Sequence, residues 1–578
     1  MIEDVYNPVQ KFRSEFRDKF KEVAEQTFED LLKHSGLDVE ANKEIVNKIR
    51  FSEQIIEGLR SRLSKLTIWQ VILWLVNIGC IVAGIYYYGQ TLYHYIPIFF
   101  IVVVLSLFIL FGVISPKKKT AKQELEEECS SVEKNKKIAW EQMQPLNRLF
   151  DWDVTVRMIS KTVPCIHFDP FFTKGRLSEL YRQFGWNDSY NDDKSVLFAH
   201  SGEINGNPFI LGRTIYMQWG EKIYHGEKKI SYWVNDGKNS YKRTETLDAS
   251  VVKPYPEYFA DTFLLYGCDA APNLVFYREC SGIANKENSF WGKLSKRSEQ
   301  KKLEKFSRNL EDESQYTMMP NRDFETLFNT MDRNNEVEYR LLFTPIAQTQ
   351  MLEIMRNKTE GYGDDFSFDK LNKVNCVKAI HLDNLELDNN PERYKSYSVE
   401  QSRQKFMMYN QEYFRALYFA FAPLLAIPLY QQTRTHENIY GIKENYRSCF
   451  WEHEAIANFY GDEKFKHPDC VTHSILKTTE SRNSDATSQI EVTAYGYRTE
   501  DRVESVRVRG GDGRSYNVDV HWDEYLPVSQ TSPLRIEEDM VGFENREMNA
   551  SERADYISRK ESSVNDGVYR RSMLSRFD

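Results

Sequence analysis

The chain lacks the sequence signatures of several common enzyme and metal-binding classes. It contains no P-loop, no G-x-S-x-G nucleophile elbow, no HExxH pair and no EF-hand loop. Its eight cysteines are scattered through 578 residues, and no two of them form a C-x-x-C pair. Such spacing is unlike a disulfide framework and suits a reducing compartment. The familiar nucleotide hydrolases, serine hydrolases and zinc proteases are therefore poor models for this chain.

Positive charge is also in short supply. The 76 lysines and arginines are outnumbered by 85 aspartates and glutamates, which gives a net charge of -9. The chain as a whole therefore offers no electrostatic reason to expect nucleic acid as a partner. Hydrophobic residues make up 41% and aromatic residues 14% of the chain, which is enough to fill sizeable cores. This composition excludes both a polytopic membrane protein and a disordered chain.

Two long apolar runs near the N-terminus contain no charged residue. They cover residues 66–88 and 95–115. About 20 apolar residues in a helix cross a hydrocarbon layer of about 30 Å, so both runs are long enough. Residues 1–65 precede the first run, which is unlike a cleavable signal peptide. We therefore predict a transmembrane helical hairpin at residues 66–115.

The charges that flank these runs predict their orientation. The connector, residues 89–94, has no lysine or arginine, whereas both outer flanks are basic. Because lysine and arginine resist translocation, both chain ends are expected in the cytosol. Asn77 lies inside the first run and is expected to hydrogen-bond between the helices, with a substrate or ion contact as the alternative. The basic flanks are Arg60, Arg62, Lys65, Lys117, Lys118, Lys119 and Lys122, and the aromatic belt near the connector is Tyr86, Tyr87, Tyr88, Tyr93 and Tyr95.

Helical patterns flank the hairpin on both sides. Apolar residues recur at spacings of three and four before the first run and after the second. Two such helices, joined by a hairpin, must run antiparallel, so we predict that residues 1–65 and 116–150 include a helical stalk with the character of a coiled coil. Its seams are Ile45, Ile49, Ser52, Ile56, Leu59, Leu63 and Leu66 on one helix and Ala121, Leu125, Val132, Ala139 and Leu146 on the other.

An earlier helix is predicted to begin at Asn7-Pro8, an N-cap followed by proline. Its apolar stripe is expected to pack against the helices that follow, with the membrane surface as the alternative. The stripe consists of Val9, Phe12, Phe16, Phe20, Val23 and Leu31.

From residue 151 onward the pattern predicts α+β structure with mainly antiparallel sheets. Residues 151–280 form one predicted domain, with hairpin turns at Asn205-Gly206 and Asp236-Gly237. Residues 316–440 form a second domain, in which residues 336–343 are expected to be extended and residues 346–355 helical. The basic segment 281–315 between the domains is predicted as a solvated linker or helix, with contact to anionic lipid or nucleic acid as the alternative.

The rest of the chain is predicted in three pieces. The apolar run 416–430 contains Pro423 and Pro428, which argues against a regular helix. We expect it to be buried or to lie on the membrane surface, and a third crossing is the alternative. Residues 441–531 are predicted to be β-rich, with a hairpin turn rather than a phosphate loop at 510–513. Residues 532–578 are predicted as a charged tail, helical or loosely ordered.

One group of histidines and cysteines has residue types that suit zinc. Imidazole and thiolate are the preferred ligands of a tetrahedral zinc site. The spacing matches no standard zinc module and Pro468 interrupts it, so buried core or capping roles are the alternative. The candidate metal ligands are Cys449, His453, His467, Cys470 and His473.

Two stretches carry a resemblance to a known family. One runs from Phe324 through Asp332 to the segment 338–345, EYRLLFTP, and the other is the segment 206–216, GNPFILGRTIY. They resemble an uncharacterised family of bacterial membrane proteins, a domain of unknown function with a paired N-terminal span and a long cytosolic part. The chain departs from that pattern at Phe343 and in its tail. The resemblance implies this architecture and a bacterial plasma membrane, but no activity, cofactor or site.

These observations favour a membrane-anchored scaffold or assembly factor that presents cytosolic domains to protein partners. The expected partners are the lipid bilayer, proteins at the cytosolic face and further copies of the chain; no nucleic acid is expected. One alternative is a membrane-tethered enzyme with an unrecognised, metal-dependent site. A second alternative is a component of an oligomeric transport system. The two spans contain no charged residue, which argues against an ion path through them.

Overall fold

The computed structural model describes residues 6–89, 96–187, 193–235, 240–280, 319–434, 447–483, 487–539, 549–562 and 567–577. The chain divides into two compact units. A helical unit comprises residues 28–150 and 391–408, and a body unit comprises residues 1–27, 151–390 and 409–578. The predicted basic segment 281–315, the turn at Asp236-Gly237 and most of the connector 89–94 lie outside the described residues.

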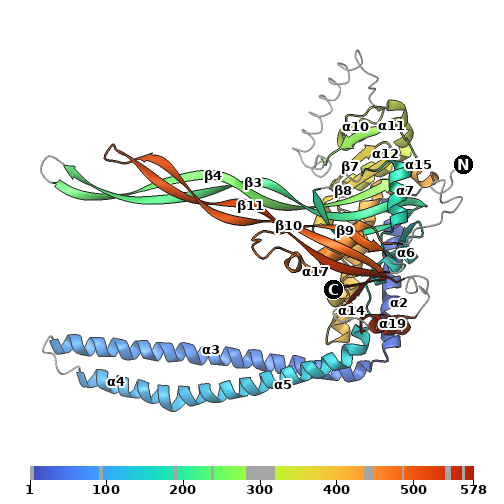
Figure 1. Cartoon of the computed structure of the whole chain (residues 1–578). Coiled ribbons are helices and arrows are strands. Elements are labelled where there is room, and N and C mark those ends of the chain that lie inside the picture. Colours follow the sequence, from blue (N-terminus) through green and yellow to red (C-terminus); the bar gives the residue numbers. More distant parts are fainter. Residues whose placement is uncertain are drawn as a thin grey trace. The chain divides into compact units, whose positions relative to one another are not determined.

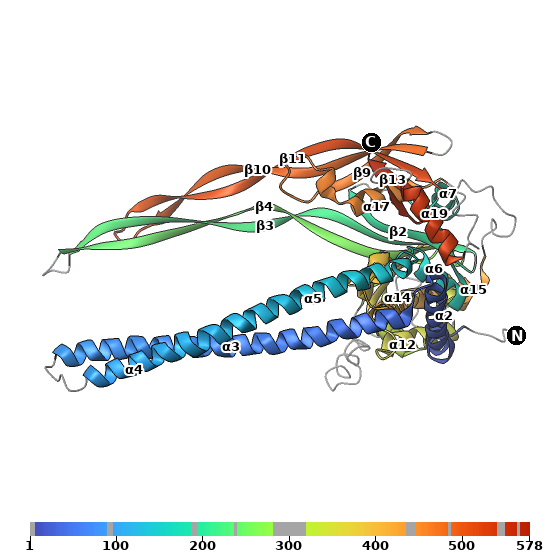
Figure 2. The same cartoon turned by 90° about the horizontal axis from the view of Figure 1, so that it is seen from below.

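The helical unit is built on two long helices that run side by side (Figures 1 and 2). The predicted seam is confirmed where Ile49 and Ile56 pack against Val132 and Ala139. At the base of this pair, the side-chain amide of Asn42 donates to the carbonyl of Tyr397 at 3.0 Å, which ties residues 391–408 to the stalk. The elements are α3 (Val39–Gly89), α4 (Ile96–Ile109), the π-helical turn η3 (Leu110–Ile114), α5 (Ser115–Asn147) and the 3₁₀ turn η5 (Pro391–Arg393).

The distal part of this pair is apolar and open. Two helices are long and apolar enough to cross a membrane, at Val39–Tyr86 and Pro97–Asn147, and only 6% and 17% of their most apolar windows are buried. Side chains such as Leu75 and Phe108 are exposed there. The amide of Asn77 is buried but finds no hydrogen-bond partner in the described part of the chain, so the expected interhelical bond is absent.

The N-terminal helix packs against a partner that its sequence does not indicate. Asn7 caps it by accepting a hydrogen bond from the Gln10 amide at 3.0 Å, as expected. Its stripe is buried as predicted, apart from the half-buried Val23, but against α14 rather than the next helices, with the rings of Phe20 and Phe414 stacked 4.2 Å apart. The helix consists of α1 (Pro8–Lys11), the π-helical turn η1 (Phe12–Phe16) and α2 (Arg17–Ser35).

The body unit contains an eight-stranded antiparallel sheet of order β1-β2-β3-β4-β8-β7-β5-β6. The sheet joins strands from residues 151–280 and from residues 316–440, so the two predicted domains share one sheet. The predicted hairpin turn is confirmed at Asn205 and Gly206, which have positive φ angles of 53° and 79°. The strands are β1 (Ile166–Phe168), β2 (Lys194–Ile204), β3 (Asn207–Asn235), β4 (Ser240–Gly267), β5 (Val275–Arg278), β6 (Thr330–Met331), β7 (Phe366–Leu371) and β8 (Val374–Ala379).

Helices cover this sheet, and the core between them is aromatic. Trp451 is fully buried among Phe172, Val196, Ile210 and Phe263. The helices are α6 (Val154–Thr162), α7 (Lys174–Phe184), α10 (Arg322–Phe328), α11 (Glu336–Leu342), α12 (Pro345–Arg356), α13 (Ile380–Asp383), α14 (Val399–Leu425), α15 (Pro428–Gln432) and α17 (Phe450–Tyr460).

Two local predictions in this region are corrected. Residues 336–343 are not extended but form α11, because Asn335 caps the helix by accepting from the Glu338 amide at 3.1 Å. The run 416–430 is buried, as one of its alternatives predicted, but it is regular helix through Leu425. Pro423 costs the helix the one hydrogen bond that its missing N–H would donate, and α14 ends two residues later, at Leu425.

A second antiparallel sheet has the order β12-β13-β11-β10-β9. Its buried side chains include Leu476, Ile490, Leu534 and Met573. The prediction of a helical or loosely ordered tail is confirmed at α19 but is wrong where residues 532–578 complete β11 and add two strands. The elements are β9 (Ile475–Asn483), β10 (Thr487–Arg509), β11 (Ser515–Glu538), α19 (Ala550–Ser562), β12 (Val568–Arg570), β13 (Met573–Phe577) and the 3₁₀ turn η6 (Asp462–Lys464).

Two hairpins of unusual length project from these sheets. Strands β3, β4, β10 and β11 have 29, 28, 23 and 24 residues, against a usual strand length of about five or six. The hairpins lie side by side in both views (Figures 1 and 2). We call residues 219–256 and 498–526 the β arm. A cluster between the hairpins holds the arm together, because a two-stranded ribbon is marginal alone; it includes Ile230, Leu247, Val251, Val518 and Val520.

Candidate functional site

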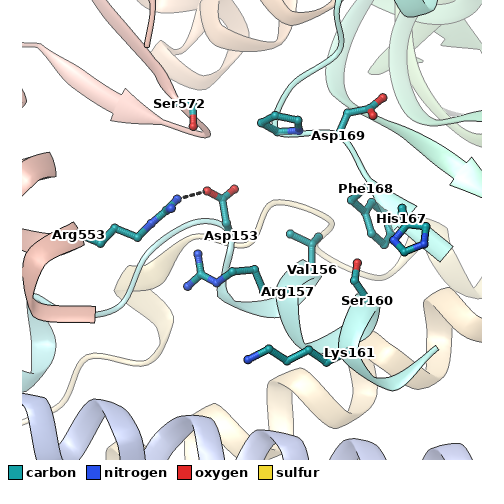
Figure 3. A pocket seen from close by; sticks show the side chains of 11 residues that line it. Asp153, Val156, Arg157, Ser160, Lys161, His167, Phe168, Asp169, Arg553 and Ser572 are labelled. Atoms are coloured by element: carbon teal, nitrogen blue, oxygen red, sulfur yellow. Dashed lines mark hydrogen bonds and ion pairs between the residues drawn. The ribbon is translucent and has the colours of Figure 1, made fainter. Parts of the chain in front are cut away.

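A cavity of about 220 Å³ lies in the body unit between α6, β1, α19 and the β12–β13 turn (Figure 3). Helix α6 is amphipathic, with Val154, Met158 and Ile159 buried. Its opposite face presents Arg157 and Lys161, which are four residues apart and therefore point the same way. The remaining wall residues include Ser160, His167, Asp169, Arg553 and Ser572.

Two carboxylates, the buried Asp151 and the half-buried Asp153 of the cavity wall, bind the guanidinium groups on this side. Arg157 Nη2 donates to Asp151 at 2.8 Å, and Arg553 reaches both Asp151 and Asp153. Burial acts to raise the pKa of Asp151, but Arg157 and Arg553 outweigh it and hold that pKa below its usual value. Burial raises the pKa of Asp153, and the charge of Arg553 only partly offsets that effect. The pair of acids therefore anchors the guanidinium groups in the wall.

On the other wall of the cavity, the charge of Asp169 is balanced by an arginine outside the cavity lining. Arg176 forms ion pairs with Asp169 at 3.1 Å and Glu203 at 2.7 Å, and Ser201 donates to Asp169 at 2.6 Å. Burial, then the charge of Arg571, keeps the pKa of the neighbouring His200 well below its usual value. The acid on this side of the cavity is therefore engaged in structural contacts.

Several polar groups that line the cavity have no partner. Arg157 Nη1 is buried and makes no hydrogen bond to any described residue. The side chains of Ser160, Lys161 and His167 likewise make none within the described ranges. A guanidinium, an ammonium and a hydroxyl on one helix face suit a small anion such as a phosphate or carboxylate. Among the wall residues that the structure describes, no hydrogen bond pairs a nucleophile with a base.

A strained turn lies at the edge of the cavity. Arg571 and Ser572 have φ angles of 44° and 58°, a backbone region that costs non-glycine residues about 1–3 kcal/mol each. The turn is held because Arg571 donates to the buried carboxylate of Glu452 at 2.6 Å and to the carbonyl of Ala199 at 2.8 Å. Ser572 is thereby fixed in the cavity wall.

A larger and more open cavity, of about 640 Å³, lies at the root of the β arm. Tyr258, Tyr495 and Tyr497 line it. Lys477, which also lines it, forms an ion pair with Glu454 at 2.8 Å. Burial raises the pKa of Tyr258 to about 12, so its hydroxyl stays neutral and donates to the carbonyl of His473. This cavity offers apolar contact but few free charged groups.

The first two predicted metal ligands have structural roles. Cys449 is the buried N-cap residue of α17, and its backbone amide donates to the carbonyl of Phe172 at 3.0 Å. His453 is buried 2.9 Å from the Ser448 hydroxyl, which itself donates to Glu538 at 2.7 Å. This trio is not a catalytic triad, because the acid contacts the serine rather than the histidine and Ser448 is fully buried.

The other three predicted ligands lie in the loop before β9. His467 accepts a hydrogen bond from the amide of Asp469 at 3.2 Å, Cys470 is buried beside Gly496, and His473 is exposed. Across the part of the chain that the structure describes, no group of three or more His, Cys, Asp or Glu side chains is arranged to hold a metal ion.

Sequence reasoning did not single out the cavity residues. They come from segments about 400 residues apart, and each segment taken alone looks like an ordinary charged helix face or turn. The only local signal is Asp153, which directly precedes an amphipathic helix.

Comparisons of the chain with family models, with curated proteins and with solved structures found no significant match.

Proposed function

We propose that the chain is a membrane-anchored adaptor, whose helical hairpin crosses a bacterial plasma membrane and whose body and β arm present binding surfaces in the cytosol. One observation carries the proposal: the apolar windows of α3 and of the α4–α5 helix are almost entirely exposed. At 6% and 17% burial they differ from the core helices of a soluble protein. Their transfer from water into lipid is strongly favourable.

The proposed sidedness rests on flanking charge. Basic residues such as Arg62 and Lys118 stand at the outer ends of both helices, and the connector has none. Translocating those residues is costly, so both termini stay on the cytosolic side. The resemblance to the bacterial two-span family is consistent with this arrangement.

An adaptor role is favoured over catalysis by what the body presents. Its most conspicuous feature is a long arm with a large surface, and its cavities offer binding groups without a nucleophile–base pair. Affinity capture of the full chain, solubilised in detergent, tests the role. A stoichiometric protein partner that is lost when the β arm is altered supports it, whereas recovery of the chain alone contradicts it.

Anchoring itself is tested by extraction of native membranes at alkaline pH. The proposal predicts that the chain stays with the membrane fraction. A variant in which the exposed Leu75 and Phe108 are both changed to Asp should lose membrane association. Release of the unaltered chain would overturn the anchor.

A second candidate function, the binding of a small anion, is supported by the unpartnered Nη1 of Arg157 in the wall of the smaller cavity. Inorganic phosphate should raise the melting temperature of the wild-type chain. The Lys161→Gln variant should respond less, whereas Lys466→Gln, at a half-buried lysine elsewhere that pairs with Glu463, should respond fully. Equal responses in all three would remove this candidate.

A further inference from the structure

The far end of the β arm has a charge opposite to that of the chain as a whole. We call residues 228–235, 240–247 and 506–516 the arm tip. The arm tip contains seven basic and two acidic residues, whereas the complete chain has a net charge of -9. All seven basic side chains are exposed. They are Lys228, Lys229, Lys242, Arg243, Arg507, Arg509 and Arg514.

Basic residues nearer the body are paired, but those of the arm tip are not. Lys222 lies 3.7 Å from Asp523, Arg502 lies 2.6 Å from Glu524, and Lys253 pairs with Glu504. None of the seven arm-tip residues forms an ion pair with any residue that the structure describes. The shaft, residues 219–227, 248–256, 498–505 and 517–526, has nine acidic and four basic residues and is therefore negatively charged, in contrast to the arm tip.

The two acids of the arm tip have internal roles. Glu245 accepts from the hydroxyl of Tyr232 at 3.0 Å and from the amide of Gly511 at 2.9 Å, which fastens one hairpin to the turn of the other. Asp512 accepts from the hydroxyl of Tyr516 at 2.6 Å and from the amide of Arg514 at 3.0 Å. Neither carboxylate pairs with a basic side chain of the residues that the structure describes, so the excess positive charge of the tip is not neutralised by them.

Aromatic side chains accompany these charges. Trp233 is 70% exposed and lies directly opposite Lys242 in the hairpin, so the two side chains share one face. Tyr241, beside Lys242, is 50% exposed. Folding leaves a tryptophan and a tyrosine in water at the end of a long projection, although burying either would have been favourable.

We infer that the arm tip is a binding surface for an anionic lipid bilayer. Phospholipid headgroups supply negative charge, and the interfacial layer accepts the amphipathic rings of Trp and Tyr. This inference rests on the proposed membrane anchor, because the anchor keeps a bilayer at high effective concentration near the arm.

The arm tip lies far along a long projection. Sixteen residues of β3, 220–235, extend about 50 Å at roughly 3.3 Å per residue.

The test uses the full chain in lipid nanodiscs and a water-soluble reagent that acetylates lysine. One set of nanodiscs contains phosphatidylcholine alone, and the other contains equal parts of phosphatidylglycerol and phosphatidylcholine. Mass spectrometry follows Lys229 and Lys242, with Lys222 and Lys253 of the shaft as internal controls. The inference predicts several-fold slower acetylation at the arm tip in the anionic discs only, reversed by high salt.

Matched variants separate charge from fold. Lys242→Gln with Arg243→Gln removes two charges at the tip and should weaken protection of Lys229, because each basic residue near an anionic surface contributes about five-fold in binding. Lys222→Gln with Lys253→Gln removes two charges from the shaft and should leave that protection intact. Trp233→Ala should weaken protection as well, with the charge unchanged.

Two outcomes would overturn the inference: equal acetylation of the arm tip in both lipids, or equal effects of the tip and shaft variants. Its failure is distinguishable from failure of the anchor. A chain that enters nanodiscs but shows no tip protection retains the anchor and loses the tip contact. A chain that does not enter nanodiscs loses the anchor, and acetylation with the same lipids added as vesicles then decides the tip contact alone.

Discussion

Arg571 Nη2 donates to Glu452 Oε2 at 2.6 Å, and both side chains are buried. The bond joins the turn between β12 and β13 to the first turn of α17, and Glu452 also accepts from the backbone amide of Phe172 at 2.8 Å. Burial raises the pKa of Glu452, and Arg571 opposes that effect. The β12–β13 turn is thereby held to helix α17, which precedes it in the chain.

Glu452→Gln is expected to lower the free energy of unfolding by about 3–5 kcal/mol, because it leaves the buried guanidinium of Arg571 without its counter-charge. Chemical unfolding of the detergent-solubilised chain measures the effect. The control is Glu15→Gln, which breaks an exposed pair with Lys11 and should cost less than about 1 kcal/mol. Similar losses in the two variants would contradict this account of the buried pair.

His453 predicts a loss of stability in acid. Burial lowers its pKa to about 4, against an ordinary value of 6.5, with Glu480 and Lys174 as smaller opposing influences. Between pH 6.5 and 4 the unfolded chain binds a proton at His453 that the folded chain does not bind. The contribution of the neutral ring to the free energy of unfolding is therefore complete above about pH 6.5 and is lost as the pH falls towards 4. The loss is on the order of 3 kcal/mol.

Thermal unfolding at a series of pH values checks this prediction. His453→Gln should reduce the decline of the melting temperature below pH 6.5. His200, whose pKa burial also lowers, and Glu360, whose pKa Arg13 lowers to about 2, contribute to the part that remains. The control is His473→Gln, at an exposed histidine, which should leave the decline unchanged. An unaltered decline in His453→Gln would show that this ring is not the cause.

Gly226 marks the close approach of the two hairpins of the β arm. A Cβ at this position would lie 2.4 Å from the backbone oxygen of Asp519 and 3.0 Å from the Cα of Val520. Gly226→Ala should therefore push the hairpins apart at a cost of about 1–3 kcal/mol. Hydrogen exchange in β10 and β11 should become faster.

The matched control for that variant is Gly58→Ala in the stalk, where a Cβ meets nothing within 4 Å. This change is expected to stabilise its helix by up to about 1 kcal/mol. If Gly226→Ala leaves exchange in β10 and β11 as slow as in the wild-type chain, the packing described for the arm is incorrect.

The stalk seam gives a prediction for the helical unit. Ile49 is fully buried between the helices, whereas Phe51, two residues later, is 65% exposed. Ile49→Ala should lower stability by about 2–5 kcal/mol through lost burial and the cavity that remains. Phe51→Ala removes a larger side chain but should cost much less, as thermal unfolding would show. The reverse order of the two effects would place the seam on the other face of α3.

Local patterns predicted much of the secondary structure. Apolar spacing gave the long helices and the seam from Ile45 to Ile56, and the Asn205-Gly206 pair gave the β2–β3 turn, because these signals depend on neighbours in sequence. The extended prediction for 336–343 failed because the capping bond of Asn335 outweighed a short apolar run.

Contacts between segments far apart in the chain could not be predicted from the sequence. Nothing in the N-terminal stripe indicates that Phe20 stacks on Phe414, and nothing in the charged tail indicates that Arg571 is buried. The same holds for the cavity, whose walls meet only when residues near 157 and near 553 are brought together. A charged residue in the sequence predicts an exposed position. An arginine that is buried with an acid partner cannot be told apart from a solvated arginine, so strands and sites that contain such pairs are not predicted.

The adaptor role requires the apolar hairpin to cross a bilayer with both chain ends on the cytosolic side. An enzyme reporter that is active only outside the cytosol, fused after residue 578 and, in a second chain, within the connector 89–94, tests this claim most directly. Activity from the connector fusion and none from the C-terminal fusion is the predicted result. An active C-terminal fusion, or two inactive fusions from chains that alkaline extraction releases, would contradict it.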